Sequence, residues 1–120
     1  MATILIIDDE KPIRFALAAM LAGEGHEVLQ AENGSRGIAV LEGCPVDVVI
    51  SDILMPEKEG LETIIELRRR WPDLPVIAIS GGGRTGTANY LYLAAQLGAT
   101  ATLDKPFTRA EMLARLETCL

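Results

Sequence analysis

The chain has 120 residues, of which 49% are hydrophobic and 23% are charged. This length suits one domain, and the composition is typical of a globular protein rather than a disordered one. The 17 acidic residues outnumber the 11 basic residues, which argues against non-specific nucleic-acid binding because such binding requires clustered Lys and Arg.

The N-terminal region contains an apolar run over residues 4–7. This run is too short for a signal peptide or a membrane span, and no basic leader precedes it. We therefore expect a cytoplasmic protein that makes no contact with a membrane.

Short β-rich apolar runs alternate along the chain with longer segments of helical periodicity, a pattern typical of βα units that close on a parallel sheet. The expected strands cover residues 4–7, 27–31, 46–50, 75–79 and 101–103. The expected helices cover residues 13–23, 34–41, 60–70, 85–97 and 108–120, and a capping box at Thr108 and Glu111 opens the last one. The predicted fold class is α/β, a doubly wound five-stranded parallel sheet with helices on both faces. Ligands of such sheets bind beyond the carboxyl ends of the strands.

Polar side chains follow four of the five expected strands. In chain order they are Asp8, Asp9 and Glu10, then Asp52, then Ser80, then Lys105. Each one alone has an ordinary explanation as a helix cap or a loop residue. Carboxylates that converge on one edge, however, would raise each other's pKa unless a cation were bound, and Mg²⁺ typically shares carboxylates with a phosphate group. The pattern therefore favours a phosphoryl-transfer pocket with Asp52 as the nucleophile.

These residues resemble the receiver domains of two-component response regulators over essentially the whole chain. The motifs that carry the resemblance are Asp8-Asp9, Asp52-Ile53-Leu54-Met55-Pro56, Ser80, Gly98-Ala99 and Lys105-Pro106-Phe107. The resemblance implies one receiver domain over residues 1–120, with the flavodoxin-like sheet order 2-1-3-4-5. It also implies that the Lys105–Pro106 peptide bond is cis, as in many relatives.

The resemblance further implies a role for each site residue. The Mg²⁺ ligands would be Asp9, Asp52 and the backbone carbonyl of Leu54, and Asp8 would bind the ion either directly or through water. Asp52 would accept the phosphoryl group from a histidine kinase or a histidine phosphotransfer protein. Ser80 would hydrogen-bond this group and Lys105 would pair with it.

The domain would then be a phosphorylation-dependent signalling switch that catalyses only its own phosphoryl transfer and autodephosphorylation. Its output would pass through altered protein contacts on the face of the fourth helix, fifth strand and fifth helix. The fourth helix carries two apolar stripes, one through Tyr92 and one through Leu93, and a helix buries only one stripe against a sheet. The second stripe therefore predicts a partner surface.

Two features depart from the usual receiver pattern. Where this chain has Thr102, relatives carry a Tyr or Phe that rotates inward on phosphorylation. The stretch between Ser80 and Gly98 is also longer than the common pattern, and it contains the glycine-rich segment 81–87. This segment lacks the Lys of a nucleotide-binding loop. Because Thr102 cannot supply the buried area of an aromatic ring, we expect displacement of residues 81–97 to carry the output.

An enzyme is the alternative interpretation, namely a stand-alone phosphohydrolase with an Asp nucleophile and Mg²⁺. Such enzymes usually need a second acidic group beside the nucleophile, and Leu54 provides none. Cys44 and Cys119 have neither metal-binding nor redox spacing and are expected to be reduced. We expect His26 to be a surface residue, and residues 68–70, all Arg, to form a solvated helix end favoured by the helix dipole.

Overall fold

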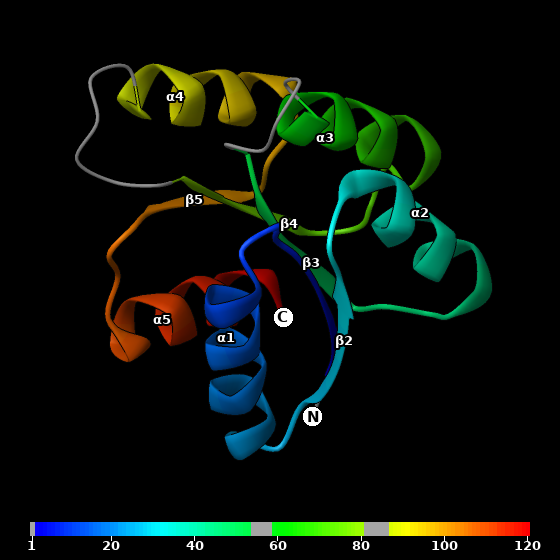
Figure 1. The fold of residues 1–120 in the computed structure, drawn as a ribbon. Helices are drawn as coiled ribbons and strands as arrows, with labels where there is room; N and C mark the ends of the chain where they lie inside the picture. Colours follow the sequence, from blue (N-terminus) through cyan, green and yellow to red (C-terminus); the bar gives the residue numbers. More distant parts are fainter. Residues whose placement is uncertain (1, 54–58, 81–86) are drawn as a thin grey trace.

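The computed structural model describes residues 2–53, 59–80 and 87–120, and it confirms the expected alternation of strands and helices (Figure 1). The strands are β1 (Thr3–Ile7), β2 (Glu27–Ala31), β3 (Val48–Asp52), β4 (Val76–Ser80) and β5 (Ala101–Asp104). The helices are α1 (Lys11–Gly23), α2 (Gly34–Gly43), α3 (Glu59–Arg70), α4 (Thr87–Leu97) and α5 (Arg109–Cys119).

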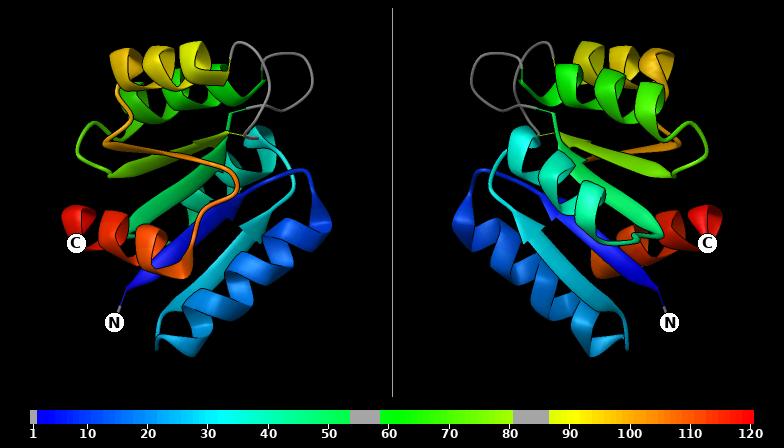
Figure 2. Two further views of the ribbon diagram at one scale, coloured as in Figure 1. Left: turned by 90° about the vertical axis from the view of Figure 1, so that its left-hand side faces the viewer. Right: turned by 90° about the vertical axis from the view of Figure 1, so that its right-hand side faces the viewer.

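The strands form one parallel sheet in the order β2-β1-β3-β4-β5, as predicted. Helices α1 and α5 cover one face of this sheet, while α2, α3 and α4 cover the other (Figures 1 and 2). Each crossover helix returns the chain to the same end of the sheet. The carboxyl ends of all five strands therefore lie along one edge.

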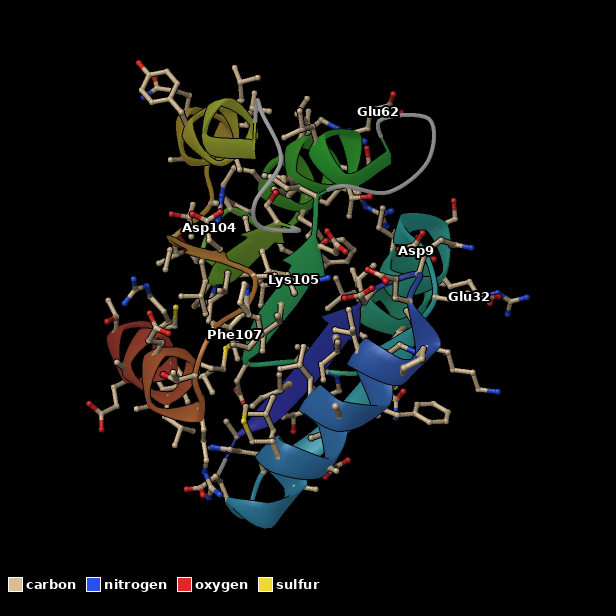
Figure 3. All side chains as sticks on the ribbon, turned by 60° about the vertical axis from the view of Figure 1, so that its left-hand side comes forward. Asp9, Glu32, Glu62, Asp104, Lys105 and Phe107 are labelled. Carbon is tan, nitrogen blue, oxygen red and sulfur yellow. The ribbon has the colours of Figure 1, made fainter. Side chains whose placement is uncertain are left out.

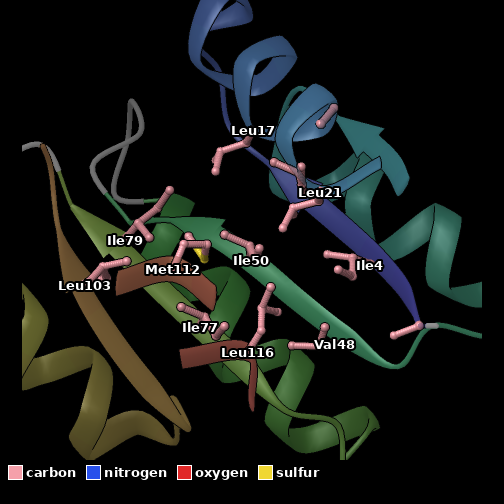
Figure 4. Packing of buried hydrophobic residues seen from close by; sticks show 13 residues of the cluster. Ile4, Leu17, Leu21, Val48, Ile50, Ile77, Ile79, Leu103, Met112 and Leu116 are labelled. Carbon is pink, nitrogen blue, oxygen red and sulfur yellow. The ribbon is translucent and has the colours of Figure 1, made fainter. Parts of the chain in front are cut away.

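Two hydrophobic clusters hold the layers together, one on each face. Along β1, Ile4 and Ile6 pack toward α1 and α5, whereas Leu5 and Ile7 pack toward the opposite layer. Figure 4 shows the first cluster, in which side chains such as Leu21 from α1 and those from α5 meet the sheet. Strands β3 and β4 are buried along their whole length. Their apolar sequences therefore reflect burial on both faces.

Specific side chains define the helix ends. The Asn33 side chain caps α2 by accepting a hydrogen bond from the backbone N–H of Arg36. The capping box that opens α5 is present as predicted. Thr108 Oγ1 accepts from the Glu111 N–H, and the Glu111 carboxylate accepts from the Thr108 N–H.

Some expectations about the chain need correction. Strand β3 begins at Val48 rather than residue 46; the preceding Asp47 instead accepts the Thr3 N–H through its side chain, at 2.8 Å. His26 is partly buried, and its Nδ1 accepts the backbone N–H of Ala2 at 3.1 Å. It therefore has a structural contact rather than a purely solvated side chain.

The expectation of a solvated helix end is wrong for Arg68. Its guanidinium donates hydrogen bonds to the backbone carbonyls of Gly98, Trp71 and Pro72. Gly98 has φ +118°, and an added Cβ there would lie 2.9 Å from Arg68 Nε. Arg68 therefore joins the end of α3 to the turn between α4 and β5, and that turn requires glycine.

No helix among residues 2–53, 59–80 and 87–120 combines the length and the apolar character that a membrane crossing requires.

Candidate functional site

Three strand ends bring their polar residues together. Asp8 directly follows β1, Asp52 is the last residue of β3, and Lys105 directly follows β5. Lys105 Nζ lies 3.0 Å from Asp52 Oδ2 and 3.2 Å from Asp8 Oδ2. Figure 3 shows Lys105 and Asp9 at the same edge of the sheet. The predicted convergence of these residues is thus present.

Burial divides the site into a floor and a rim. Asp8 is fully buried, Asp52 is 2% exposed, and the side chain of Lys105 is 11% exposed. Asp9 and Glu10 are exposed at the rim. The floor is therefore largely shielded from water, where charge interactions are stronger than at the surface.

The position of Asp8 is fixed by four hydrogen bonds. Its Oδ1 accepts the backbone N–H of Glu10 at 2.8 Å, and its Oδ2 accepts from Lys105. Its own N–H donates to the Ala31 carbonyl at 3.1 Å. Its carbonyl accepts from Arg14 Nη1 at 2.8 Å. The carboxylate therefore needs no reorganisation to face the pocket.

Sequence reasoning missed the contribution of Arg14. This residue lies in α1, and besides Asp8 it contacts the Gln30 side chain of β2 through Nε, at 3.2 Å. It thereby ties the loop after β1 to two neighbouring elements. The only sequence signal was its position one helical turn into α1, on the same side as the acidic loop.

The acidic residues form a group with metal-binding geometry. Asp8, Asp9, Glu10 and Asp52 each offer a carboxylate oxygen, and these oxygens all lie within 4.8 Å of one another. Sequence reasoning placed Glu10 at this strand end but gave it no role. Oxygen donors of this kind at this spacing suit Mg²⁺, which binds carboxylates together with water and phosphate oxygens. The residues present therefore fit the metal that the motif implies.

The pKa values reflect the crowding of like charges. Burial, followed by the neighbouring carboxylate of Asp8, raises the pKa of Asp9 above its ordinary value. For Lys105, burial alone would lower the pKa, but the carboxylates of Asp52 and Asp8 outweigh burial and raise it. The pocket therefore holds its lysine in the charged form and carries an excess of negative charge.

Ser80 lies beside Lys105 at the same edge of the sheet. It is the last residue of β4 and is fully buried, and its backbone carbonyl accepts the Lys105 N–H at 2.7 Å. Its hydroxyl has no hydrogen-bond partner among the residues that the structure describes. A buried hydroxyl left without a partner costs about 1–3 kcal/mol, so a ligand that accepts from it would recover this cost.

Other predicted features have mixed outcomes. The Lys105–Pro106 peptide bond is cis, as expected. Leu54 and residues 81–86 lie outside the described part of the chain.

On α4, Tyr92 is 66% and Leu93 45% exposed. At the position of the usual aromatic residue, the Thr102 carbonyl accepts a hydrogen bond from Arg115 Nε of α5.

Comparison with known proteins then identifies the family. The model of the response regulator receiver domain matches residues 4–117, nearly the entire chain. The chain belongs to this family. Receiver domains of response regulators are signalling switches, and the acidic pocket described above belongs to such a domain.

Its relatives include regulators and isolated receiver domains. The receiver domain is 38% identical to the DNA-binding transcriptional regulator NtrC of Azospirillum brasilense over 99% of the chain, and covers 24% of that protein. It is 35% identical to the transcriptional regulatory protein CpxR of Klebsiella pneumoniae over its whole length, and covers 50% of that protein. The chain thus spans half or less of these two curated relatives.

A solved structure of a separate receiver domain confirms the fold. The structure of a response regulator receiver domain protein from Clostridium thermocellum superposes with a TM-score of 0.86 at 34% identity. The match covers 99% of this chain and 94% of that one. The predicted flavodoxin-like architecture is therefore shared over the whole receiver domain.

Proposed function

We propose that residues 1–120 form one receiver unit that accepts a phosphoryl group on Asp52, with Mg²⁺, from a histidine kinase or a histidine phosphotransfer protein. One observation carries this proposal. The Asp52 carboxylate, 2% exposed, lies 3.0 Å from the ammonium of Lys105 inside a cluster of four carboxylates. Such a cluster favours a divalent cation, and a cation with a lysine can neutralise a phosphoryl group.

The proposed transfer uses Asp52 as the nucleophile. A carboxylate oxygen of Asp52 bonds to phosphorus while the P–N bond of the phosphohistidine donor breaks. The electron pair of that bond stays on the ring nitrogen, and the leaving group is a neutral imidazole because the other ring nitrogen of the donor carries a proton. Burial of Asp52 removes competing water from the carboxylate, and its fixed place beside Lys105 orients it for attack.

The metal would be held by the residues that converge at the strand ends. Its proposed ligands are the carboxylates of Asp8, Asp9 and Asp52 and the backbone carbonyl of Leu54, which lies outside the described residues. When bound, Mg²⁺ supplies positive charge to the phosphoryl oxygens. The hydrogen bond from the Glu10 N–H already turns the Asp8 carboxylate toward this position.

Lys105 and Ser80 would receive the transferred group. The ammonium of Lys105 contacts Asp52 before transfer, so it can pair with a phosphoryl oxygen after transfer with little movement. The Ser80 hydroxyl, which is buried, can donate a hydrogen bond to the same group. Both contacts are stronger with the phosphoryl group than without it, which is the condition for a ligand to shift a conformational equilibrium.

The proposed cycle ends in hydrolysis. A water oxygen bonds to phosphorus, the bond from phosphorus to Asp52 breaks, and inorganic phosphate leaves with the water protons. The alternative is the stand-alone phosphohydrolase. Incubation with acetyl phosphate and Mg²⁺ separates the two. A phosphoprotein with one group per chain that decays slowly supports the switch, whereas rapid release of phosphate over many turnovers supports the enzyme.

We further propose that the output surface consists of α4, β5 and α5. Tyr92 and Leu93 expose large apolar side chains on α4, and such side chains are typical of protein contact surfaces. The proposed partner is a downstream protein, and we propose that the domain itself contacts neither nucleic acid nor membrane and acts in the cytoplasm.

The output proposal can be tested by amide hydrogen exchange with and without beryllofluoride, a phosphoryl mimic, in the presence of Mg²⁺. Protection changes concentrated in residues 81–97 are expected. If α1 and α2 responded while this segment stayed unchanged, α4 would not belong to the output surface.

A further inference from the structure

We infer that Glu10 is a specificity-determining residue of this pocket, which strengthens Mg²⁺ binding and disfavours phosphodonors of high negative charge. This inference rests on the proposed function of Asp52 as the phosphoryl acceptor. It concerns a residue whose carboxylate belongs to the acidic cluster but is not among the four proposed metal ligands.

The side chain of Glu10 faces the pocket instead of its own helix. Glu10 is the N-cap residue of α1, yet its side chain makes no capping hydrogen bond. Its Oε1 lies 3.6 Å from Lys105 Nζ, although 58% of the side chain is exposed. The dipole of its own helix favours an acidic residue at this position, but without a capping bond it is the contact with Lys105 that directs the carboxylate toward the pocket.

Distance indicates that Glu10 acts through its charge. Lys105 is closer to Asp52 and Asp8, at 3.0 and 3.2 Å, than to Glu10 at 3.6 Å. The two nearer carboxylates are also the buried ones, so they fix the position of the ammonium. Glu10 is the third carboxylate in contact with this ammonium, and it lies at the exposed rim of the pocket.

The net charge of the pocket shows the effect of the Glu10 carboxylate. Counted over the residues that the structure describes, the cluster has four carboxylates and, in Lys105, one ammonium. One bound divalent cation would leave a single negative charge, and without Glu10 the same group would be neutral. The extra charge attracts Mg²⁺ and repels an anionic phosphodonor. The repulsion grows with the charge of the donor.

The Glu10 charge should favour Mg²⁺ binding and disfavour an anionic phosphodonor, so its removal should change the two measurements in opposite directions. Three variants are compared with the wild type, namely Glu10→Gln, which removes the charge, Glu10→Asp, which keeps it, and Glu27→Gln. The last is the matched control, because Glu27 is exposed and begins β2 at the opposite end of the sheet. All three change exposed side chains, and thermal melting verifies that each variant folds.

Mg²⁺ affinity is measured by calorimetry. Phosphorylation rates are measured at saturating Mg²⁺ with acetyl phosphate, a dianion at neutral pH, and with phosphoramidate, a monoanion. Glu10→Gln should weaken Mg²⁺ binding about three- to tenfold and should still accelerate phosphorylation by acetyl phosphate several-fold, with a smaller gain for phosphoramidate. Glu10→Asp should stay within about twofold of the wild type. Glu27→Gln should match the wild type in every measurement.

An unchanged Mg²⁺ affinity in Glu10→Gln would overturn the inference, as would equal rate changes with both donors or an equal response in Glu27→Gln. In these cases the wild type is still phosphorylated, so the proposed function stands. If the wild type accepted no phosphoryl group from either donor, the proposed function itself would fail, and this inference with it.

Discussion

Lys105 Nζ lies 3.0 Å from Asp52 Oδ2, although 53 positions separate the two residues in the chain. The parallel sheet produces this contact because β3 and β5 end at the same edge. The ammonium also contacts the buried carboxylate of Asp8. Stability without metal should therefore depend on the balance between one lysine and several carboxylates.

Replacement of Lys105 and of Asp52 should change stability in opposite directions. Lys105→Met removes the ammonium that pairs with the buried carboxylates of Asp8 and Asp52, so the free energy of unfolding should fall by about 3 kcal/mol in the absence of Mg²⁺. Asp52→Asn leaves Lys105 paired with Asp8 and removes one like-charge repulsion, so stability should rise slightly. Urea denaturation in the presence of a chelator measures both. Destabilisation of both variants to the same extent would contradict this charge balance.

Mg²⁺ should stabilise the folded domain because it binds the assembled cluster and hardly binds the unfolded chain. At a concentration one hundred times its Kd, the gain should be about 2.7 kcal/mol. Asp9→Ala should lose most of this gain, since the exposed Asp9 carboxylate belongs to the cluster without packing in the core. Ser80→Ala should retain it. Thermal melting over a Mg²⁺ titration makes the comparison, and a full response in Asp9→Ala would remove that residue from the metal site.

Arg68 and Arg69 are neighbours with different expected contributions. Arg68→Ala removes hydrogen bonds to the carbonyls of Gly98, Trp71 and Pro72, and should cost about 2 kcal/mol. Arg69→Ala breaks an exposed ion pair with Glu66 and should cost less than about 1 kcal/mol. Chemical denaturation of the two variants tests this difference. Equal costs would mean that the Arg68 contacts add little to the fold.

The capping box of α5 should give a pH-dependent contribution. The hydrogen bond from the Thr108 N–H lowers the pKa of Glu111 below its ordinary 4.5. A lowered acid pKa stabilises the fold above pH 4.5, and this contribution disappears as pH falls through the pKa of the folded state. The stability difference between wild type and Glu111→Ala should therefore be constant near neutral pH and shrink below pH 4.5.

Thr108→Ala serves as the comparison for this pH series. It should cost about 1 kcal/mol, and most of that cost should persist in acid because the hydroxyl does not titrate. A difference between wild type and Glu111→Ala that stayed constant throughout the acid range would show that the Glu111 carboxylate does not stabilise the cap.

Local sequence patterns predicted the parts of this structure that depend on neighbouring residues. Apolar runs of strand length located the strands, and Thr108 with Glu111 marked the start of α5, because both signals arise within a few residues. The meeting of Asp8, Asp52 and Lys105 followed from the general rule for parallel sheets.

The remaining features depend on partners that the fold brings close. Arg14 and Arg68 bind backbone carbonyls, and any residue supplies a carbonyl, so no sequence pattern marks these partners. The orientation of Glu10 was equally hidden, because an acidic residue before a helix is usually interpreted as a cap. Its contact with Lys105 appears only once β5 lies beside β4 and the pocket is formed.

The most direct test of the proposed function is to locate the phosphoryl group. The wild type and Asp52→Asn are incubated with acetyl phosphate and Mg²⁺, and their masses are measured intact and after peptide mapping of the trapped acyl phosphate. We predict one phosphoryl group per wild-type chain, located on Asp52, and none on the variant. Uptake by Asp52→Asn at the wild-type rate, or a wild-type label on another residue, would contradict the assignment of Asp52 as the acceptor.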